Sequence, residues 1–402
     1  MAVLRARDVL ERRHPPAAQE PTVISGDVIV LLIIILLCGY IWYTAFRSKP
    51  QHHAFAEEVQ MPRNRSLGRS IEWPFTIRQL NKTTWLIREN DRFGEHPHIY
   101  VKKHTETLPD GRQASILVVT DTGCGTSQPN PMTKTGKENI KTFIDQHLNP
   151  HSDCLYLVIL SHCHYDHILG LNPILQPGRD AGESQSRRTL IMSSAYNRNF
   201  LEPRSQLRHH SLCASMGLQC PSFKTTIWAH QNERITITHP KHGLRMHLPI
   251  TTLQTPGHTS DSLSWYDEDE RVLYVGDSFY DQESPDSRSA PWGREKPAPI
   301  LFPNEGNLHD WWRSLNMLIA FVEEKNAEEG GERVKLSAGH VTVGADALIC
   351  LLDVKEFMEK VVGDEVQFEE QPEKRGERFG FWSEDGGRFS LGAPLRVIEG
   401  GG

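Results

Sequence analysis

The sequence Ser161-His162-Cys163-His164-Tyr165-Asp166-His167 directly follows an apolar run, Leu155 to Leu160. Neutral imidazole and carboxylate groups hold zinc and similar ions, and a strand that ends in a tight turn can direct all four such side chains toward one point. A solvated histidine-rich loop is the alternative. However, His-x-His-x-Asp-His directly after a buried strand rarely arises by chance. The stretch therefore predicts a metal centre at the end of a strand.

Four residues on one turn cannot complete two metal sites, so further ligands are expected elsewhere in the chain. Four more strand-like segments do end in an aspartate or a histidine. They are Ile116 to Thr120 before Asp121, Leu248 to Leu253 before His258, Val272 to Val275 before Asp277, and Val334 to Ala338 before His340. Each residue alone has an ordinary explanation, such as an exposed turn histidine or an Asx turn. Their joint occurrence at strand ends favours ligation.

This order of motifs resembles the metallo-β-lactamase-fold hydrolases, and the resemblance spans Ile116 to His340. It implies an α/β fold, a four-layer αβ/βα sandwich with the metals at one edge between two sheets. It also implies two divalent metal ions, with Zn²⁺ as the first choice. The ligands so implied are His162, His164 and His258 for one ion, Asp166, His167 and His340 for the other, and Asp277 as the bridge. Asp121 is implied to be structural, bracing the turn that carries the histidines.

The resemblance implies hydrolysis by a metal-bound hydroxide, which is available at neutral pH because the metals lower the pKa of bound water. Asp166 is implied to hold this hydroxide or to move its proton, which makes it the expected catalytic base. His164 supports hydrolysis, since oxygen-reducing relatives with a di-iron centre carry Glu at this position. Asp121-Thr122-Gly123 also matches aspartic proteases, but those enzymes need two such carboxylates, and the sequence has no second copy.

The neighbours of the expected ligands have other roles. Cys163 is expected in the core, because alternation along an extended segment points it away from the metals. Tyr165 either faces the pocket or packs behind the turn. The other histidines are expected on the surface or around the site, namely His209, His210, His230, His239, His242, His247 and His309.

Val28 to Phe46 is an uncharged apolar segment of roughly 19 residues, which is enough to cross a bilayer as a helix. Aromatic residues cluster at its C-terminal end, as they do at a membrane interface. The sequence therefore predicts an uncleaved single-pass anchor and a membrane localisation. Basic residues flank the segment almost equally, which leaves the side of the catalytic domain open.

The predicted domains are a flexible tail (1–27), the anchor (28–46), a stalk (47–70) and a hydrolase domain with a C-terminal hairpin (71–402). In the last of these, the pattern predicts alternating strands and helices. Besides the segments above, strands are expected over Phe75–Leu80, Thr84–Arg88, His98–Lys103 and around Asp267-Glu268-Asp269, helices over Glu138–Leu148, Leu308–Glu324 and Asp346–Val362, and the hairpin within Phe379–Val397.

Two long connections, 176–222 and 278–307, are expected to form walls or lids of the site. Phe279, Tyr280 and Trp292 in the second of them are candidates for the pocket lining. Other substrate-binding residues stay unknown at this stage.

Composition narrows the choice of partners. The 402 residues carry a net charge of −7 without an extended basic stripe, which disfavours nucleic acid. The seven cysteines show no framework spacing, so free thiols are expected, although Cys213 and Cys220 would be able to pair in an oxidising compartment.

The sequence thus predicts a membrane-anchored metallohydrolase that opens an ester-like bond (lactone, thioester or β-lactam) in a small, apolar molecule. A phosphodiesterase or nuclease of the same fold is the first alternative. A mononuclear iron oxygenase and a non-enzymatic binding module are the others. The oligomeric state is left open.

Overall fold

Residues 74–108, 110–129, 137–176, 189–239, 242–284, 298–328 and 330–400 are described by a computed structural model. The predicted tail, anchor (Val28–Phe46) and stalk lie outside the described residues. Among the residues that are described, no helix is long and apolar enough to cross a membrane. The longest of them, α6 (Leu308–Asn326), carries charged residues toward both ends. This finding contradicts the single-pass membrane localisation that was expected from the sequence.

A seven-stranded sheet forms the first half of the fold. In spatial order its strands are β1 (Phe75–Gln79), β2 (Thr84–Glu89), β3 (His98–Thr107), β4 (Gln113–Thr120), β7 (Leu155–Ile159), β8 (Thr189–Ser194) and β9 (Ile227–Ala229). The first four are antiparallel neighbours, whereas β4, β7, β8 and β9 run parallel. All five residues of β7 are buried, as is typical of a parallel strand covered on both faces.

A six-stranded sheet forms the second half. Its strands are, in spatial order, β10 (Glu233–Thr238), β11 (Arg245–Gln254), β12 (Leu263–Asp267), β13 (Val272–Tyr274), β15 (Lys335–Ser337) and β16 (Ala345–Asp346). The two sheets share one apolar core, in which side chains of β4 and β7 meet those of β11 and β12. Trp265 in this core donates its indole N–H to Thr120 Oγ1 at 3.0 Å, which ties the sheets together.

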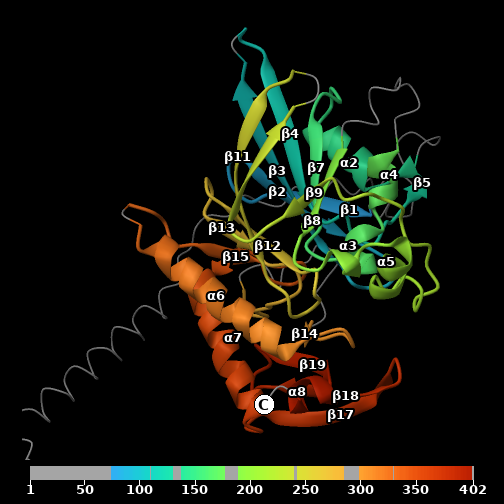
Figure 1. Ribbon diagram of the computed structural model, residues 1–402, viewed down its shortest axis with the longest axis vertical. Helices are drawn as coiled ribbons and strands as arrows, with labels where there is room; N and C mark the ends of the chain where they lie inside the picture. The colour runs from blue at the N-terminus through green and yellow to red at the C-terminus, as the bar shows by residue number, and fades with distance from the viewer. Residues whose placement is uncertain are drawn as a thin grey trace, which may run out of the picture. The chain divides into compact units, whose positions relative to one another are not determined.

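Helices cover both outer faces of the paired sheets (Figure 1). On the first sheet lie α2 (Ile140–Leu148), α3 (Tyr165–Ile168), α4 (Leu171–Leu175), the 3-10 turn η2 (Arg198–Phe200) and α5 (Arg204–His210), and on the second lie α6 and α7 (Ala347–Val362). Asn139 begins α2 by accepting a hydrogen bond from Thr142 N at 3.1 Å. This layering agrees with the expected αβ/βα sandwich.

A third sheet of four strands packs beside α6 and α7 near the C-terminus (Figure 1). Its strands are β14 (Ile300–Leu301), β19 (Ser390–Pro394), β18 (Glu377–Ser383) and β17 (Gln367–Lys374), and α8 (Leu395–Glu399) follows β19. The predicted hairpin corresponds to β18 and β19. Strand β17 was not predicted, because its residues are largely charged and exposed and show no apolar alternation. A short pair, β5 (Gln128–Pro129) and β6 (Lys137–Glu138), lies before α2.

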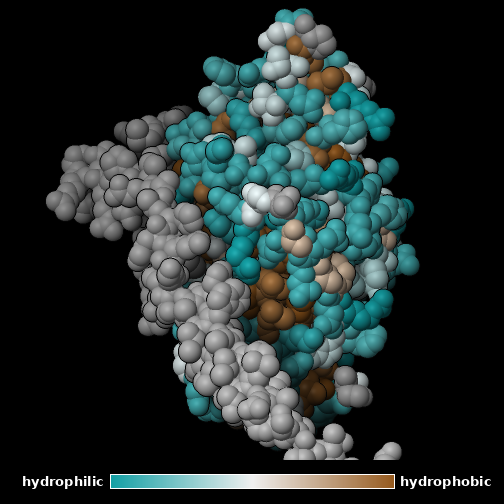
Figure 2. All heavy atoms as spheres, turned by 90° about the vertical axis from the view of Figure 1, so that its left-hand side faces the viewer, coloured by the Kyte–Doolittle hydropathy of each residue, from teal (hydrophilic) through white to brown (hydrophobic). Residues whose placement is uncertain are grey.

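Figure 2 shows the side on which α6 and α7 lie. Hydrophilic side chains cover most of the visible surface, and hydrophobic side chains gather near its middle. Leu352 and Val362 of α7 are among the exposed large hydrophobic residues.

Candidate metal centre

The end of β7 positions the first four candidate ligands. His162 and His164 lie in the loop that leaves the strand, and Asp166 and His167 lie in the single-turn helix α3. All four side chains are buried. Cys163, between the two histidines, is fully buried in the core under the first sheet, in agreement with the sequence-based expectation.

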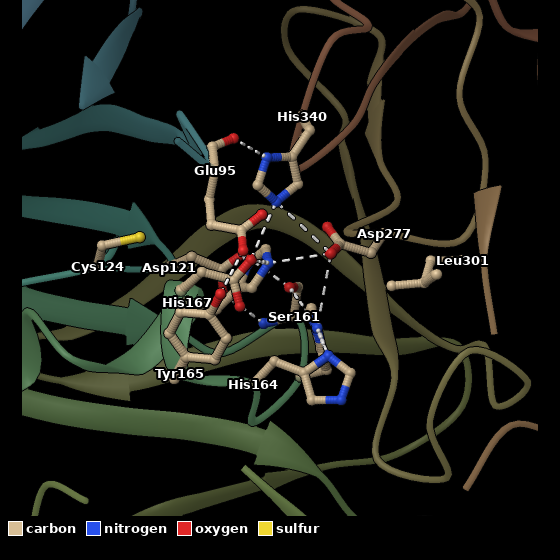
Figure 3. Close-up of polar contacts among 12 residues, drawn as sticks. Glu95, Asp121, Cys124, Ser161, His164, Tyr165, His167, Asp277, Leu301 and His340 are labelled. Atoms are coloured by element: carbon tan, nitrogen blue, oxygen red, sulfur yellow. Dashed lines mark hydrogen bonds and ion pairs between the residues drawn. The ribbon is translucent and has the colours of Figure 1, made fainter. Parts of the chain in front are cut away.

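The second sheet supplies the other three candidates. His258 follows β11, Asp277 follows β13 and His340 follows β15, each in the loop just beyond the strand. Because β13 and β15 are parallel neighbours, their carboxyl ends meet at the same edge, which brings Asp277 and His340 together. The edge faces the loop after β7, so the donors converge from both halves of the fold (Figure 3).

The first group of donors consists of three histidines. His164 Nδ1 lies 2.9 Å from His162 Nε2 and 3.1 Å from His258 Nε2, and the two Nε2 atoms are 3.3 Å apart. Nitrogen atoms that share one tetrahedral zinc ion at about 2.0–2.1 Å are separated by roughly 3.3 Å. The three imidazoles are thus arranged as ligands of one ion.

The second group consists of Asp166, His167, Asp277 and His340. Asp277 Oδ2 lies 3.1 Å from His167 Nε2 and 3.6 Å from His340 Nε2. The same oxygen is 3.8 Å from His162 Nε2, a member of the first group. Asp166 Oδ2 lies 3.2 Å from His340 Nε2. Asp277 therefore stands between the two groups, in the position that a bridging carboxylate requires.

The outward-facing ring nitrogens of three histidines are held by hydrogen bonds. His167 Nδ1 lies 2.8 Å from Asp121 Oδ2, His258 Nδ1 lies 2.6 Å from the carbonyl of Leu301, and His340 Nδ1 lies 2.8 Å from the carbonyl of Glu95. Such partners fix the tautomer and the orientation of a ligating ring. Each of these histidines consequently presents Nε2 to the site.

Asp121 connects β4 to the histidine-bearing turn. Its two oxygens accept hydrogen bonds from the backbone N–H and the hydroxyl of Ser161, at 2.8 and 2.7 Å. The same carboxylate binds His167, as described above. Asp121 is buried and outside both donor groups, so its contacts brace the turn.

Burial sets the charge state of the first group. Desolvation is the largest cause that lowers the pKa of His162, His164 and His258, and the value for His164 falls to about 3. These three imidazoles are neutral at physiological pH. Neutral imidazole is the form that binds a metal ion.

The second group attracts positive charge. Burial opposes protonation of His340, yet the charges of Asp277 and Asp166 outweigh it and raise the pKa of His340 to about 9. The pKa of His167 is raised in the same way, against desolvation, by Asp277, Asp166 and Asp121. A divalent cation would displace the protons that these carboxylates favour. The nitrogen and oxygen donors, their spacing and their charge together fit a divalent metal pair.

Five of the seven donors line a cavity of about 430 Å³, namely His164, Asp166, His258, Asp277 and His340. Both long connections contribute to its walls, as expected from the sequence. The apolar wall consists of Leu212, Met216, Ala298, Pro299, Leu301 and Val341. The polar wall consists of Glu95, His96, Tyr165 and Tyr280. The cavity can thus hold a small molecule that has both apolar and polar groups, in contact with several of the donors.

Comparison with known proteins agrees with this geometry. The family model described as "Metallo-beta-lactamase superfamily" matches residues 116–328. The chain belongs to this superfamily. The match confirms the resemblance that the strand-end motifs indicated.

The individual proteins that resemble this chain have low sequence identity to it. The chain is 28% identical, over 338 residues, to a protein of Aspergillus versicolor named "Putative transcription factor avaE", and the match covers 81% of this chain and 88% of that protein. Among solved structures, a metallo-beta-lactamase family protein from Thermus thermophilus is 18% identical, with a TM-score of 0.42 over 70% of this chain and 81% of that one. The metallo-beta-lactamase from Pontibacter korlensis is 13% identical, with a TM-score of 0.43 over 71% and 99%.

Of the residues that were expected to line the pocket of this metallo-beta-lactamase domain, one does so and another does not. Tyr280 lines the cavity, whereas Phe279 is buried against Trp311, with ring centroids 5.2 Å apart. The expectation for Phe279 was therefore wrong, because an aromatic residue next to a site residue serves the core equally well. Trp292 lies outside the described residues. Tyr165 faces the pocket, and its hydroxyl donates a hydrogen bond to Glu95.

Two other sequence-based expectations can be examined in this domain. Cys213 and Cys220 are free thiols, both buried. His209 and His210 lie near Glu305 and form a third group of potential donors. Both oxygens of Glu305 bind Arg375, at 2.6 and 2.8 Å, so this group is an ion pair with neighbouring histidines.

Proposed function

We propose that this protein is a metal-dependent hydrolase that cleaves an ester-like bond (a lactone, thioester or β-lactam) in a small molecule. The observation that carries the proposal is the complete set of seven donors, in two groups joined by Asp277, five of which line a cavity. We further propose that residues 71–402 form one hydrolase domain, and that Zn²⁺ is the native metal because imidazole and carboxylate ligands suit it.

The proposed ligands are those implied by the strand-end motifs: His162, His164 and His258 for one ion, Asp166, His167 and His340 for the other, and Asp277 for both. Two divalent ions held there would supply a hydroxide at neutral pH and stabilise the oxyanion that forms when it attacks a carbonyl.

The chain's own residues have defined tasks in such a reaction. Without a metal, His167 and His340 outweigh the effect of burial and lower the pKa of Asp166. A bound divalent cation would replace their charge and favour the same ionised carboxylate. An ionised carboxylate in the cavity lining can accept the proton of the attacking water and pass it to the leaving group. The apolar lining residues Leu212, Met216 and Leu301 would exclude water from the parts of the substrate that they contact.

The alternatives have less support in the described residues. The cavity lining includes no lysine or arginine among the described residues, although a phosphodiester would benefit from one. The Aspergillus relative is named as a putative transcription factor, which suggests a test of DNA binding. The net charge of −7 disfavours that role for this chain.

The full chain should be tested on acyl lactones, acyl thioesters, a β-lactam and an activated phosphodiester, each with and without a chelator. We expect chelator-sensitive hydrolysis of one of the acyl classes, and loss of both turnover and metal in Asp277→Ala. Normal activity in that variant would overturn the dinuclear proposal. Silence toward the whole panel, in folded and metal-loaded protein, would argue against a hydrolase and for the iron oxygenase or a binding role.

A further inference from the structure

Glu95 is placed at the cavity by an ordered loop between β2 and β3. The Asp91 carboxylate organises this loop, because its Oδ1 accepts hydrogen bonds from the backbone N–H groups of Phe93 and Gly94, at 2.7 and 2.9 Å. Its Oδ2 accepts a third from the N–H of His96 at 2.7 Å. The loop therefore has a defined conformation, and Glu95 lies at its centre.

Two further contacts fix Glu95 itself. Its backbone carbonyl lies 2.8 Å from His340 Nδ1, so the residue is tied to one of the candidate ligands. Its carboxylate accepts a hydrogen bond from the hydroxyl of Tyr165, whose ring packs edge-on against Phe93 with centroids 5.4 Å apart. The Glu95 carboxylate is thus held on the polar wall beside the metal centre (Figure 3).

The distribution of charge on the cavity walls makes Glu95 distinctive. Apart from the candidate ligands, it is the only carboxylate among the described lining residues, and these include no lysine or arginine. Glu95 is exposed and belongs to the cavity lining, so its carboxylate can meet a bound substrate. An exposed glutamate carboxyl group ordinarily loses its proton well below about pH 8.

An ionised carboxylate in this position distinguishes substrates by charge. A second negative charge bound a few ångströms away would be repelled, whereas a hydroxyl or amide N–H of the substrate could donate a hydrogen bond to it. The apolar wall, with Leu212, Met216 and Leu301, suits an apolar chain or ring. The two walls together match an uncharged amphipathic molecule.

We infer that Glu95, positioned by Tyr165, is a specificity-determining residue that selects uncharged acyl substrates with a hydrogen-bond donor and rejects those that carry a carboxylate or a phosphate. The inference rests on the proposed hydrolase function and narrows it. Neutral lactones and esters are favoured over β-lactams that carry a carboxylate and over phosphodiesters.

The test compares two esters of equal chain length, 4-nitrophenyl hexanoate and mono-4-nitrophenyl adipate, which differ by one terminal carboxylate. At about pH 8 the wild-type chain should prefer the neutral ester, and Glu95→Gln should reduce the ratio of the two kcat/KM values about tenfold. Glu95→Lys should reduce it further. Metal content should be unchanged in both variants, since the contact with His340 is made by the backbone of residue 95.

Two further variants, one of them a control, separate a change in specificity from a general loss of activity. Glu369→Gln, on the exposed strand β17, should leave the ratio as in the wild type. Tyr165→Phe keeps the ring but removes the hydroxyl that holds Glu95, and should change the ratio in the same direction by a smaller factor. An unaltered ratio in metal-loaded Glu95→Gln would overturn the inference.

A binding measurement tests Glu95 even if no substrate is hydrolysed. Mercaptoacetate and 2-mercaptoethanol both offer a thiolate to a bound metal, but only the first carries a carboxylate. We expect Glu95→Gln to improve the affinity of mercaptoacetate relative to 2-mercaptoethanol by about tenfold, measured by calorimetry on the metal-loaded chain. Equal relative affinities in wild type and variant would refute the role of Glu95, whereas an inactive wild type with the expected shift would refute the hydrolase alone.

Discussion

Asp121 Oδ2 lies 2.8 Å from Nδ1 of His167, and the same carboxylate accepts two hydrogen bonds from Ser161. Asp121 therefore determines which nitrogen of His167 faces the second donor group. Replacing it with alanine should weaken binding of the second metal by roughly 10- to 100-fold, because the ring loses both its orientation and its charged partner. Titration with a competing chelator measures this change. Asp385→Ala, in an exposed hairpin turn, should bind both metals as the wild type does.

Gly339 lies against the metal centre in an ordinary backbone conformation. A Cβ atom at this position would overlap with Oδ1 of Asp277 and lie 2.9 Å from Cε1 of His167. Gly339→Ala should therefore displace Asp277 and reduce metal content to one ion or fewer, as measured by elemental analysis of the purified protein. Gly363→Ala, at the end of α7, is the control and should keep both metals. Two tightly bound metals in Gly339→Ala would contradict the bridging role of Asp277.

Glu89, which belongs to neither donor group, makes the stability of the fold depend on pH. Its buried carboxylate accepts hydrogen bonds from the N–H groups of Cys124 and Thr126, both at 2.7 Å. Desolvation raises its pKa from 4.5 to about 7 in spite of these bonds. Folding therefore favours the protonated form, and the stability associated with it is lost as the pH rises from about 4.5 through about 7.

The free energy of unfolding of the wild type should fall by about 3 kcal/mol over this interval relative to Glu89→Gln, which cannot titrate. Urea unfolding of both chains at several pH values, in the presence of a chelator, measures the difference. The histidines titrate in both proteins, so their contribution cancels in the difference between the two free energies of unfolding. Parallel pH profiles would show that Glu89 is ionised throughout.

His242 provides a negative prediction. Its ring lies 4.7 Å from that of His239, and neither residue belongs to a donor group or to the cavity lining. His242→Ala should keep its metal content and its hydrolytic rate within about twofold of the wild type, since surface substitutions of this kind are usually mild. A large loss of rate would mean that the site extends beyond the residues assigned to it.

The candidate site was readable in the sequence because every donor lies in the loop or short helix that follows a strand. A strand such as β7 is recognisable as a short apolar run, and residues just beyond it lie at the sheet edge. The order of these motifs carries the resemblance to the metallo-β-lactamase fold, and that resemblance placed His162, Asp277 and His340 in one site. The helices α2, α6 and α7 were predictable for a similar reason, their apolar spacing.

The walls of the cavity could not be predicted in this way. Glu95 and Leu212 are far apart in the chain, and their places depend on loops with no periodic pattern. Asp91, which shapes the first of these loops, is a residue typical of turns. It does not indicate which side chain of the turn reaches the cavity. Strand β17 was missed because it pairs through its backbone while its side chains stay exposed.

The seven donors are divided between the two sheets, four after β7 and three after β11, β13 and β15. Neither half of the fold can therefore assemble the site alone, and a bound ion would act as a clamp across their junction. Because such an ion binds only the assembled form, its affinity adds to the free energy that keeps the halves docked. A chain that lost its metal in a cell would then be less stable as well as inactive. The abundance of the protein would therefore depend on the supply of the ion.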